Sequence, residues 1–354
     1  MDWLYILMPI AGVQIFWPGL IILGVGVGII GGFFGMGGAW MVTPGLNILG
    51  FPMAFAIGTD IAHMAGKSLI STMRHGRFGN VDYKLGIIML IGTVVGFELG
   101  AQMVMWLERI GSVEKTVRFL YLFLLSFISW LVFYDVFQKR KKEQAARAAG
   151  RPVDSTVGIE WHKTFHNIHI PPMIHLKTSG IYCSAWLPIA VSLLTGWLAG
   201  ILGIGGGLIR MPALIYIIGC PTHVAVGTDL FEVMLSGLYG AATYTYKGRT
   251  ELVAAIIMLV GASMGAQIGT VATKYIKGYT IRVAFGCAVV GCAVSIVLKL
   301  LASYLPGQKA ILDGMSTVLV LGVVSALSLY IFVRMLRGAR QEIAQRKASV
   351  RRVG

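Results

Sequence analysis

Long apolar stretches dominate the chain, and those of spanning length predict transmembrane helices. A helix needs about 20 apolar residues to cross the hydrocarbon core of a bilayer. Stretches that meet this length lie at about 54–73, 84–106, 115–137, 224–245, 252–273, 279–301 and 313–336. We therefore predict an all-α polytopic membrane protein.

Two further apolar stretches, 19–50 and 184–219, are too long for one crossing and are interrupted by glycine. The interruptions read Gly35-Met36-Gly37-Gly38 and Gly203-Ile204-Gly205-Gly206-Gly207, and Pro44 and Pro212 follow them. Glycine permits backbone conformations that break a helix. Discontinuous helices of this kind recur in transporters, where they lie near the middle of the membrane.

The two interruptions belong to an internal repeat with an offset of 168 or 169 residues. Aligned pairs are Gly58-Thr59-Asp60 with Gly227-Thr228-Asp229, and Gly92, Gly96 and Gly100 with Gly261, Gly265 and Gly269. Chance similarity between apolar helices would not preserve Gly, Pro and Asp together. Glycines at four-residue spacing predict close helix packing.

Composition and charge narrow the class of protein. Hydrophobic residues make up 56% and charged residues 13% of the chain, with 46 glycines and a mean hydropathy of +0.77, which excludes a soluble globule and a disordered chain. The net charge of +15 is concentrated in residues 139–177 and 334–352, beside apolar stretches. We interpret both as cytoplasmic flanks under the positive-inside rule, and we predict no nucleic-acid partner.

Two cytoplasmic flanks require an even number of crossings between them. The stretch 184–219 must then begin and end on one side, as a re-entrant hairpin with its glycine tip near mid-membrane. Three spanning helices per repeat would give the repeats opposite orientations. We expect two inverted repeats and an extra C-terminal helix, about 7–9 membrane helices in all. Plain crossings of eight or nine helices are the alternative. The topology puts residues 247–251 outside despite Lys247 and Arg249.

The expected organisation has six parts. They are 1–17, an N-terminal membrane-associated segment; 18–137, transmembrane repeat one; 138–180, a basic cytoplasmic linker; 181–302, transmembrane repeat two; 303–337, a C-terminal transmembrane helix; and 338–354, a basic cytoplasmic tail.

Ionisable residues within spans are costly and usually functional. They are Asp60, His63 and Lys67 in the first repeat and Arg210, Asp229 and Glu232 in the second, and Glu98 also lies within an apolar stretch. We predict that Arg210, Lys67 and His63 assist anion binding and that Asp60, Asp229 and Glu232 are candidates to carry a coupling proton. Arg210 could instead snorkel to the interface. The two aspartates could instead cap helix N-termini.

The glycine tips are the main predicted binding elements. Backbone N–H groups and helix N-termini at a break favour an anion. The predicted substrate-binding residues here are Gly35, Met36, Gly37, Gly38, Gly203, Ile204, Gly205 and Gly206, with Thr59 and Thr228. Close packing of small residues is the alternative for the glycines. The two threonines could serve as ligands or as caps.

Other motifs predict no catalytic chemistry. His162, His166, His169 and His175 have spacings that could gather a metal, but interleaved aromatic and aliphatic residues also suit a segment on the membrane interface. The four cysteines form no CxxC pair. We predict no resident metal, no cofactor and no enzyme activity.

The duplicated motif resembles that of the TauE/SafE family, the sulfite exporter group of four-plus-four transporters. The segments that carry the resemblance run from Gly35 to Pro44 and from Gly203 to Pro212, each followed by Gly-Thr-Asp. The likeness spans about residues 18–302. It implies a secondary transporter in the bacterial cytoplasmic membrane that exports small sulfur-containing anions such as sulfite or organosulfonates.

The expected partners are a small anionic substrate, the lipid bilayer and a candidate coupling proton. The basic flanks predict a cytoplasmic C-terminus. A passive small-anion channel, a permease for a different anion and a membrane-embedded enzyme are the alternatives.

Overall fold

Helices form nearly all of the fold. The computed structural model describes residues 4–34, 39–148, 170–204, 206–276 and 278–353. The first repeat contains α1 (Trp17–Phe34), α2 (Ala39–Ile48), α3 (Met53–Arg77), α4 (Tyr83–Arg109) and α5 (Val113–Ala148). The second contains α7 (Trp186–Leu202), α8 (Gly207–Ala213), the π-helix η2 (Leu214–Ile218), α9 (Thr222–Tyr246), α10 (Leu252–Ala272) and α11 (Gly278–Tyr304). A short 3-10 turn, η3 (Pro306–Gln308), leads into α12 (Lys309–Val353).

Each predicted span corresponds to one helix, which confirms the all-α polytopic class. Within the described residues, six helices are long and apolar enough to cross a membrane. They are Trp17–Phe34, Tyr83–Arg109, Val113–Gln138, Leu252–Ala272, Val283–Tyr304 and Lys309–Glu342. Helices α3 and α9 carry the ionisable residues of the GTD segments, and they pack against each other where Gly237 meets Ala65.

Each glycine-broken stretch begins and ends at the same end of the bundle. Ser179, which precedes α7, donates its N–H and its hydroxyl to the Asp82 carboxylate, at 3.2 and 2.8 Å. Thr228, near the start of α9, accepts the N–H of Asp82 at 2.9 Å. The chain therefore enters and leaves the second broken stretch beside the same residue. We call this end of the bundle the Asp82 end.

The two ends of the first broken stretch lie together beside Glu251, as those of the second lie beside Asp82. Ile10 and Ala11, which precede α1, donate their N–H groups to the Glu251 carboxylate at 2.8 and 3.1 Å. Thr59 of α3 accepts the N–H of Glu251 at 3.0 Å. We call this the Glu251 end. Both broken stretches thus begin and end at one end of the bundle, as the expected re-entrant hairpins require.

The second hairpin tip passes the middle of the bundle, which corrects the expected depth. Helix α7 has 17 residues and so is about 26 Å long. It ends at Gly203, whose φ of +72° is left-handed. A Cβ at Gly203 would lie 3.0 Å from Ile57, only four residues into α3 from the Glu251 end. The tip thus lies closer to the end opposite its origin.

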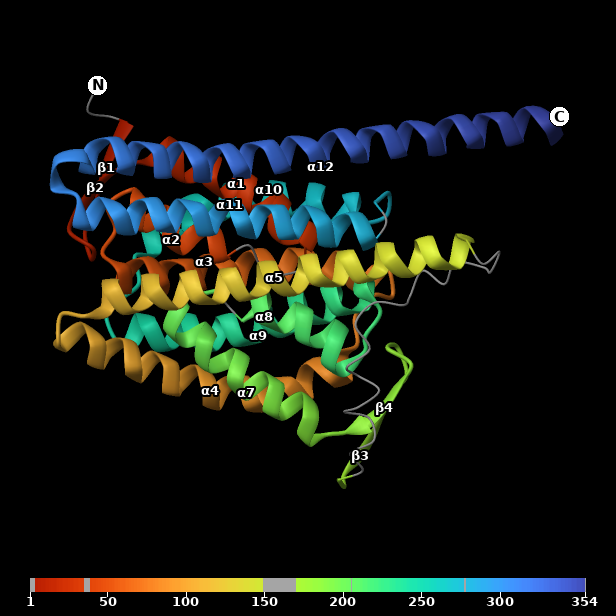
Figure 1. The fold of residues 1–354 in the computed structure, drawn as a ribbon, viewed down its shortest axis with the longest axis horizontal. Helices are drawn as coiled ribbons and strands as arrows, with labels where there is room; N and C mark the ends of the chain where they lie inside the picture. Colours follow the sequence, from red (N-terminus) through yellow and green to blue (C-terminus); the bar gives the residue numbers. More distant parts are fainter. Residues whose placement is uncertain (1–3, 35–38, 149–169, 205, 277, 354) are drawn as a thin grey trace.

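Two short β-hairpins, which the sequence patterns did not predict, lie at opposite ends of the bundle (Figure 1). Strands β1 (Tyr5–Met8) and β2 (Val13–Phe16) are antiparallel, as are β3 (Met173–Leu176) and β4 (Ile181–Ser184). The turn of the first contacts Glu251 and the turn of the second contacts Asp82. Their positions differ by the same offset as the other repeated residues, so each inverted repeat opens with a hairpin.

Two helices extend farther than expected. Helix α5 continues through Ala148 and α12 through Val353, so the basic linker and the basic tail both begin as helix. Figure 1 shows both helices running past their neighbours at the Asp82 end. Residues 149–169 lie outside the described residues.

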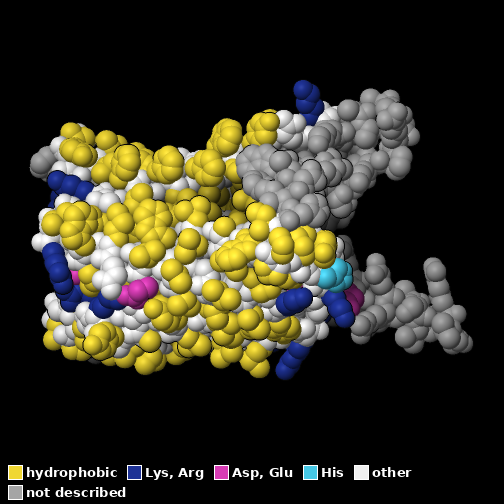
Figure 2. Space-filling view, turned by 90° about the horizontal axis from the view of Figure 1, so that it is seen from below, with side chains coloured by type: hydrophobic (Ala, Val, Ile, Leu, Met, Phe, Trp, Pro, Cys, Tyr) yellow, Lys and Arg dark blue, Asp and Glu magenta, His cyan; other side chains and the backbone are white. Residues whose placement is uncertain are grey.

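The surface matches a membrane-embedded bundle. Figure 2 shows apolar side chains over the flank, with Lys and Arg near the two ends. At the Glu251 end, Lys247 Nζ lies 3.0 Å from Glu98 and Arg249 Nε lies 2.8 Å from Glu108. These carboxylates offset the basic charge of the loop 247–251.

The spaced glycines are packing ridges, as predicted. A Cβ at Gly92, Gly96 or Gly100 of α4 would meet the backbone of α7. The equivalent glycines of α10, Gly261, Gly265 and Gly269, meet the backbone of α1 in the same way. Both helix pairs therefore approach to backbone contact, which brings the broken stretches against the spanning helices.

We expect Gly96→Val to lower the stability of the folded protein by about 1–3 kcal/mol, because no neighbouring side chain can move aside for the added atoms. The measurement is the midpoint of thermal unfolding in detergent. The matched control is Gly322→Val in α12, where nothing lies within 4 Å of an added Cβ. Equal midpoints for the two variants would contradict the packing role.

Candidate functional site

The first group of buried polar residues lies on α3, and we call it the Asp60 cluster. Asp60, His63 and Lys67 are all fully buried. Thr43 of α2 donates its hydroxyl to Asp60 Oδ2 at 2.9 Å, and His63 Nδ1 lies 3.6 Å from Asp60 Oδ1. Within the described part of the chain, Lys67 Nζ and both ring nitrogens of His63 have no hydrogen-bond partner. The cluster thus contains donors that are not used by the protein.

The second group lies between α7, α8 and α9, and we call it the Arg210 cluster. Arg210 Nη1 lies 3.3 Å from Asp229 Oδ1 and contacts Glu232 Oε2. Its Nε donates to Thr195 Oγ1 at 3.4 Å. Ser236 completes the group by donating to Glu232 at 3.4 Å. Arg210 is fully buried, so the snorkelling interpretation is wrong.

The two clusters differ in charge. In the Arg210 cluster one guanidinium faces two carboxylates, and these satisfy its positive charge. In the Asp60 cluster the ammonium of Lys67 is attracted electrostatically by the Asp60 carboxylate. It nevertheless forms no ion pair with that carboxylate within salt-bridge distance. An isolated buried charge is costly unless it is paired or hydrogen-bonded. The need for an anionic partner is therefore greater at Lys67 than at Arg210.

The threonines of the two GTD segments exchange hydrogen bonds between the repeats. Thr59 accepts the N–H of Glu251, and Thr228 accepts the N–H of Asp82. Asp82 and Glu251 are the residues that precede α4 and α10. A hydroxyl acceptor there satisfies a backbone donor at a buried helix start. Both hydroxyls thus act as caps, one of the two roles considered for them.

The glycines of the same segments permit this close approach. A Cβ at Gly58 would meet the carbonyl of Arg249, and one at Gly227 would meet the carbonyl of Asn80. The aspartates do not cap their own helices, because α3 begins at Met53 and α9 at Thr222. The capping interpretation of Asp60 and Asp229 is therefore wrong.

Tyrosines from other helices hold the second hairpin tip. Tyr121 of α5 donates to the carbonyl of Leu202, and Tyr244 of α9 donates to that of Gly200, both at 2.7 Å. Gly206 has a φ of +77°, and a Cβ there would crowd the guanidinium of Arg210. Ile204 is fully buried.

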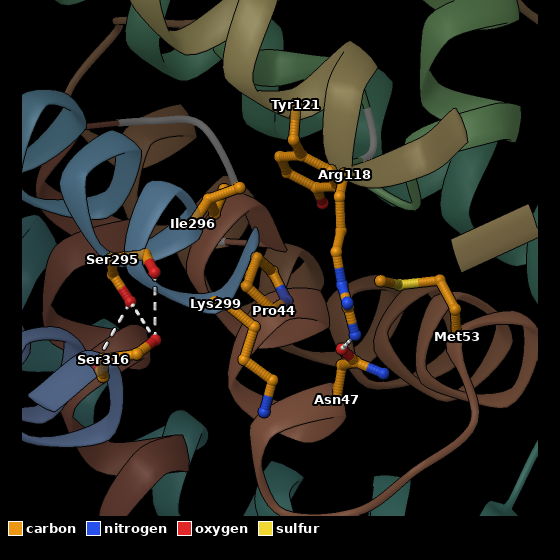
Figure 3. Close-up of a pocket in the computed structure, with 9 residues that line it drawn as sticks. All are labelled: Pro44, Asn47, Met53, Arg118, Tyr121, Ser295, Ile296, Lys299 and Ser316. Carbon is orange, nitrogen blue, oxygen red and sulfur yellow. Dashed lines mark hydrogen bonds between the residues drawn. The ribbon is translucent and has the colours of Figure 1, made fainter. Parts of the chain in front are cut away.

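A cavity of about 20 Å³ lies beside Pro44 at the Glu251 end (Figure 3). Arg118 points toward Asn47, with Nη2 3.0 Å from its amide oxygen and 3.2 Å from Glu114. Lys299 also lines the cavity and lies 3.6 Å from Asp313. Both cations here are paired with carboxylates. This cavity therefore offers an anion less uncompensated positive charge than Lys67 does.

Comparison with known proteins identifies the family. The family model of the sulfite exporters TauE/SafE matches residues 20–296. The chain belongs to the TauE/SafE family. No solved structure matches it.

Several curated proteins are similar to this TauE/SafE chain over most of their length. "Probable membrane transporter protein YunE" of Bacillus subtilis is 26% identical over 271 residues, which cover 74% of this chain and 90% of YunE. A "Probable membrane transporter protein" of Xylella fastidiosa is 28% identical over 289 residues, covering 80% and 94%. MJ0441 of Methanocaldococcus jannaschii, with the same description, is 26% identical over 234 residues, covering 64% and 72%. The chain is therefore a membrane transporter by family.

The residues predicted for the TauE/SafE site fall into three sets. Asp60, His63 and Lys67 come together in one cluster, and Arg210, Asp229 and Glu232 in another. Thr59 and Thr228 lie between the repeats. Gly35, Met36, Gly37, Gly38 and Gly205 lie outside the described residues, so anion binding by the tips stays a prediction.

The histidine segment also falls largely outside the description. His162, His166 and His169 are not described, and His175 lies on β3, where its carbonyl accepts a hydrogen bond from Lys84 at 3.2 Å. Within the described residues no group of three or more metal-ligating side chains occurs.

Sequence reasoning missed several buried polar residues of this TauE/SafE protein. Thr43 and Thr195 bind the clusters directly, and Ser68, Ser71, Thr72 and His75 extend the polar face of α3. The signal was present as hydroxyl and histidine positions at helical spacing after Lys67. This signal is weak, because hydroxyl side chains carry no charge within an apolar span and His75 lies beyond the expected span 54–73.

We expect Thr59→Val and Thr228→Val to destabilise the protein by similar amounts, about 1–3 kcal/mol each, because each leaves a buried N–H without an acceptor. Thermal unfolding in detergent measures both. Thr317→Val in α12 is the control, since its hydroxyl only bonds back to Asp313 of its own helix. A loss in one variant alone would contradict the reciprocal arrangement.

Proposed function

We propose that this TauE/SafE protein is a secondary transporter that moves small sulfur-containing anions, such as sulfite or organosulfonates, outward across the bacterial cytoplasmic membrane. Alternating access by rocking of one inverted repeat against the other is the mechanism that this architecture favours. The matching family model, named for sulfite exporters, supports the sulfur oxyanion as the substrate class.

The observation that carries the proposal is the buried ammonium of Lys67 beside His63 and Asp60. A tetrahedral or pyramidal oxyanion offers several acceptors to the unused donors of Lys67 and His63. Charge-assisted hydrogen bonds of this type are about twice as strong as neutral ones. Arg210, whose charge is satisfied by Asp229 and Glu232, would act on the substrate only if that network rearranged.

The same charge count suggests where a proton would couple to transport. The Arg210 cluster holds one positive and two negative groups, all fully buried. One proton shared between Asp229 and Glu232 makes this cluster neutral. Loss of that proton gives the cluster a net negative charge. This charge would repel an anion that crosses the same repeat interface, so the anion favours the protonated cluster. We infer that these carboxylates, with Asp60 as the further candidate, link proton and anion movement.

We propose that the Asp82 end faces the cytoplasm. The basic ends of α5 and α12 lie there, as do Arg74, Lys84 and Lys274. At the Glu251 end, basic residues are matched by carboxylates, as for Arg118 with Glu114 and Lys299 with Asp313. This asymmetry follows the positive-inside rule and puts the C-terminus in the cytoplasm.

We expect Lys67→Met to weaken binding of sulfite or a small organosulfonate by about tenfold or more, because one charged hydrogen bond contributes roughly 1.5–3 kcal/mol. The measurement is the ligand-induced rise of the melting midpoint of purified protein, since a ligand of the native state stabilises it. Flux in proteoliposomes provides the functional readout.

The control is Lys84→Met, which removes a surface lysine that bonds only a carbonyl of β3. If Lys67→Met does not fold, His63→Gln tests the same site with less change of charge. Unchanged binding in a folded Lys67 variant would overturn the site. If the wild-type protein responds to no sulfur oxyanion in the panel, the substrate class is wrong. Flux that never accumulates anion against its gradient would identify a channel instead.

We expect Glu232→Gln to abolish accumulation driven by a pH gradient while anion exchange continues. The amide keeps the shape of the side chain and its contact with Arg210, but it cannot take up or release a proton. Proteoliposomes loaded with labelled anion measure both activities in the same preparation. Glu98→Gln is the control, because Glu98 lies on α4 outside both clusters. Undiminished pH-driven accumulation in Glu232→Gln would exclude this residue from coupling.

A further inference from the structure

The polar face of α3 continues beyond the Asp60 cluster toward the Asp82 end. Lys67, Ser71 and His75 follow one another at four-residue spacing, so they share a face of the helix. Ser68 and Thr72 lie one position further along on the same side. Four of these five side chains are fully buried, and Thr72 is 5% exposed. At about 1.5 Å per residue, the row spans roughly 12 Å.

The three hydroxyls of this row are unused, unlike several other hydroxyls within the helices. Ser129, Thr270 and Thr317 each bond back to the carbonyl four residues earlier, at 2.7–2.8 Å. Ser68, Ser71 and Thr72 make no hydrogen bond in the described part of the chain. A buried hydroxyl without a partner costs about 1–3 kcal/mol. Three of them within two successive turns of one helix indicate a polar species that passes or binds there.

The fold itself does not require this row, because the second repeat lacks it. The equivalent positions on α9 are Ser236, Gly237, Gly240, Ala241 and Tyr244. A Cβ at Gly240 would contact the rings and methyls of Phe97 and Ile61. Tyr244 has its hydroxyl bonded to Gly200. The equivalent half of the second repeat is therefore packed with apolar and aromatic groups.

The row ends at an open cavity of about 730 Å³ at the Asp82 end. His75, the last residue of the row, lies beside this cavity, because its ring centroid is 6.2 Å from that of Phe78. Phe78 lines the cavity together with Asn80, His223 and Lys274. Lys274 Nζ lies over the Phe78 ring at 4.2 Å.

We propose that this face of α3 is the conduit through which a small anion moves between Lys67 and the cavity at the Asp82 end. The row and the described residues that line the cavity supply ammonium, imidazole, amide and hydroxyl groups and no carboxylate. Such a lining provides hydrogen-bond donors along its whole length and repels no anion. A path for a cation would be expected to contain acidic side chains. The inference rests on the proposed transport of anions and adds the route.

Cysteine accessibility tests the conduit without the need to know the transported anion. Ser68→Cys, Ser71→Cys and Thr72→Cys are made in a background in which the exposed Cys287 is replaced by serine. The probes are two membrane-impermeant methanethiosulfonates, one with a sulfonate head and one with a trimethylammonium head. Each is added to sealed vesicles from the Asp82 side or from the Glu251 side.

We expect all three cysteines to react from the Asp82 side and not from the Glu251 side. The sulfonate reagent should react at least about tenfold faster than the cationic one, because a cleft lined by one sign of charge concentrates the opposite sign. His223→Cys in the cavity shows that the reagent reaches the mouth. Ser129→Cys on α5 should stay unreacted, because its side chain is buried among helices away from the row.

Absence of reaction at Ser68, Ser71 and Thr72 while His223→Cys reacts would overturn the conduit. Faster reaction of the cationic reagent would overturn its assignment to anions. Labelling in a protein that transports no sulfur oxyanion would retain the conduit and reject the proposed substrate class. Transport of a sulfur oxyanion without labelling of the three cysteines would retain the substrate class and reject the conduit.

Discussion

Each repeat of this protein completes the start of a helix in the other. The hydroxyls of Thr59 and Thr228 accept the N–H groups of Glu251 and Asp82. The carboxylates of the same two residues accept N–H groups from the turns of the β-hairpins. In lipid, a backbone donor left without a partner costs several kcal/mol, so these bonds fix where the repeats meet. The positions of both polar clusters follow, because Asp60 and Asp229 are the next residues along their helices.

The pseudo-symmetry of the backbone contrasts with the asymmetry of the charges. Glu232 occupies the position equivalent to His63, and Arg210 lies where Val42 lies in the first repeat. As a result, one cluster is a closed network of ion pairs and the other keeps an ammonium without a contact partner. A symmetric scaffold supplies two equivalent positions between the helices. Differences of a few side chains make the two positions chemically distinct, and the proposed function assigns the anion to one and the proton to the other.

Local patterns were sufficient to predict much of the fold. The apolar spans and the packing glycines depend on neighbours a few residues apart, and helices lie where these patterns predicted them. The repeat is also visible in the sequence, as matched Gly, Pro and Asp positions. The β-hairpins were missed because four-residue strands carry little periodic signal, and their stabilising contacts with Asp82 and Glu251 are distant in sequence. The depth of the glycine tip depends on packing against α3, which no local spacing encodes.

The site was harder to predict than the fold. Arg210 looked like a good anion ligand because arginine is the usual partner of oxyanions, yet Asp229 and Glu232 from α9 neutralise it. Lys67 has no such partner, and that difference depends on distances between helices. The four-residue spacing of Lys67, Ser71 and His75 is visible in the sequence. The second repeat has glycines and an alanine at the positions equivalent to the hydroxyl residues, and this difference identifies the polar row as specific to the first repeat.

The exchanged hydrogen bonds between repeats also bear on how such a protein could arise. A chain that carried only one repeat would leave the N–H of the residue before α4 or α10 without its acceptor, and its β-hairpin would have no carboxylate to contact. A second copy inserted upside down in the same membrane would supply both. The arrangement is therefore that of a dual-topology dimer whose halves have been joined into one polypeptide, with the segment between α5 and β3 as the connection.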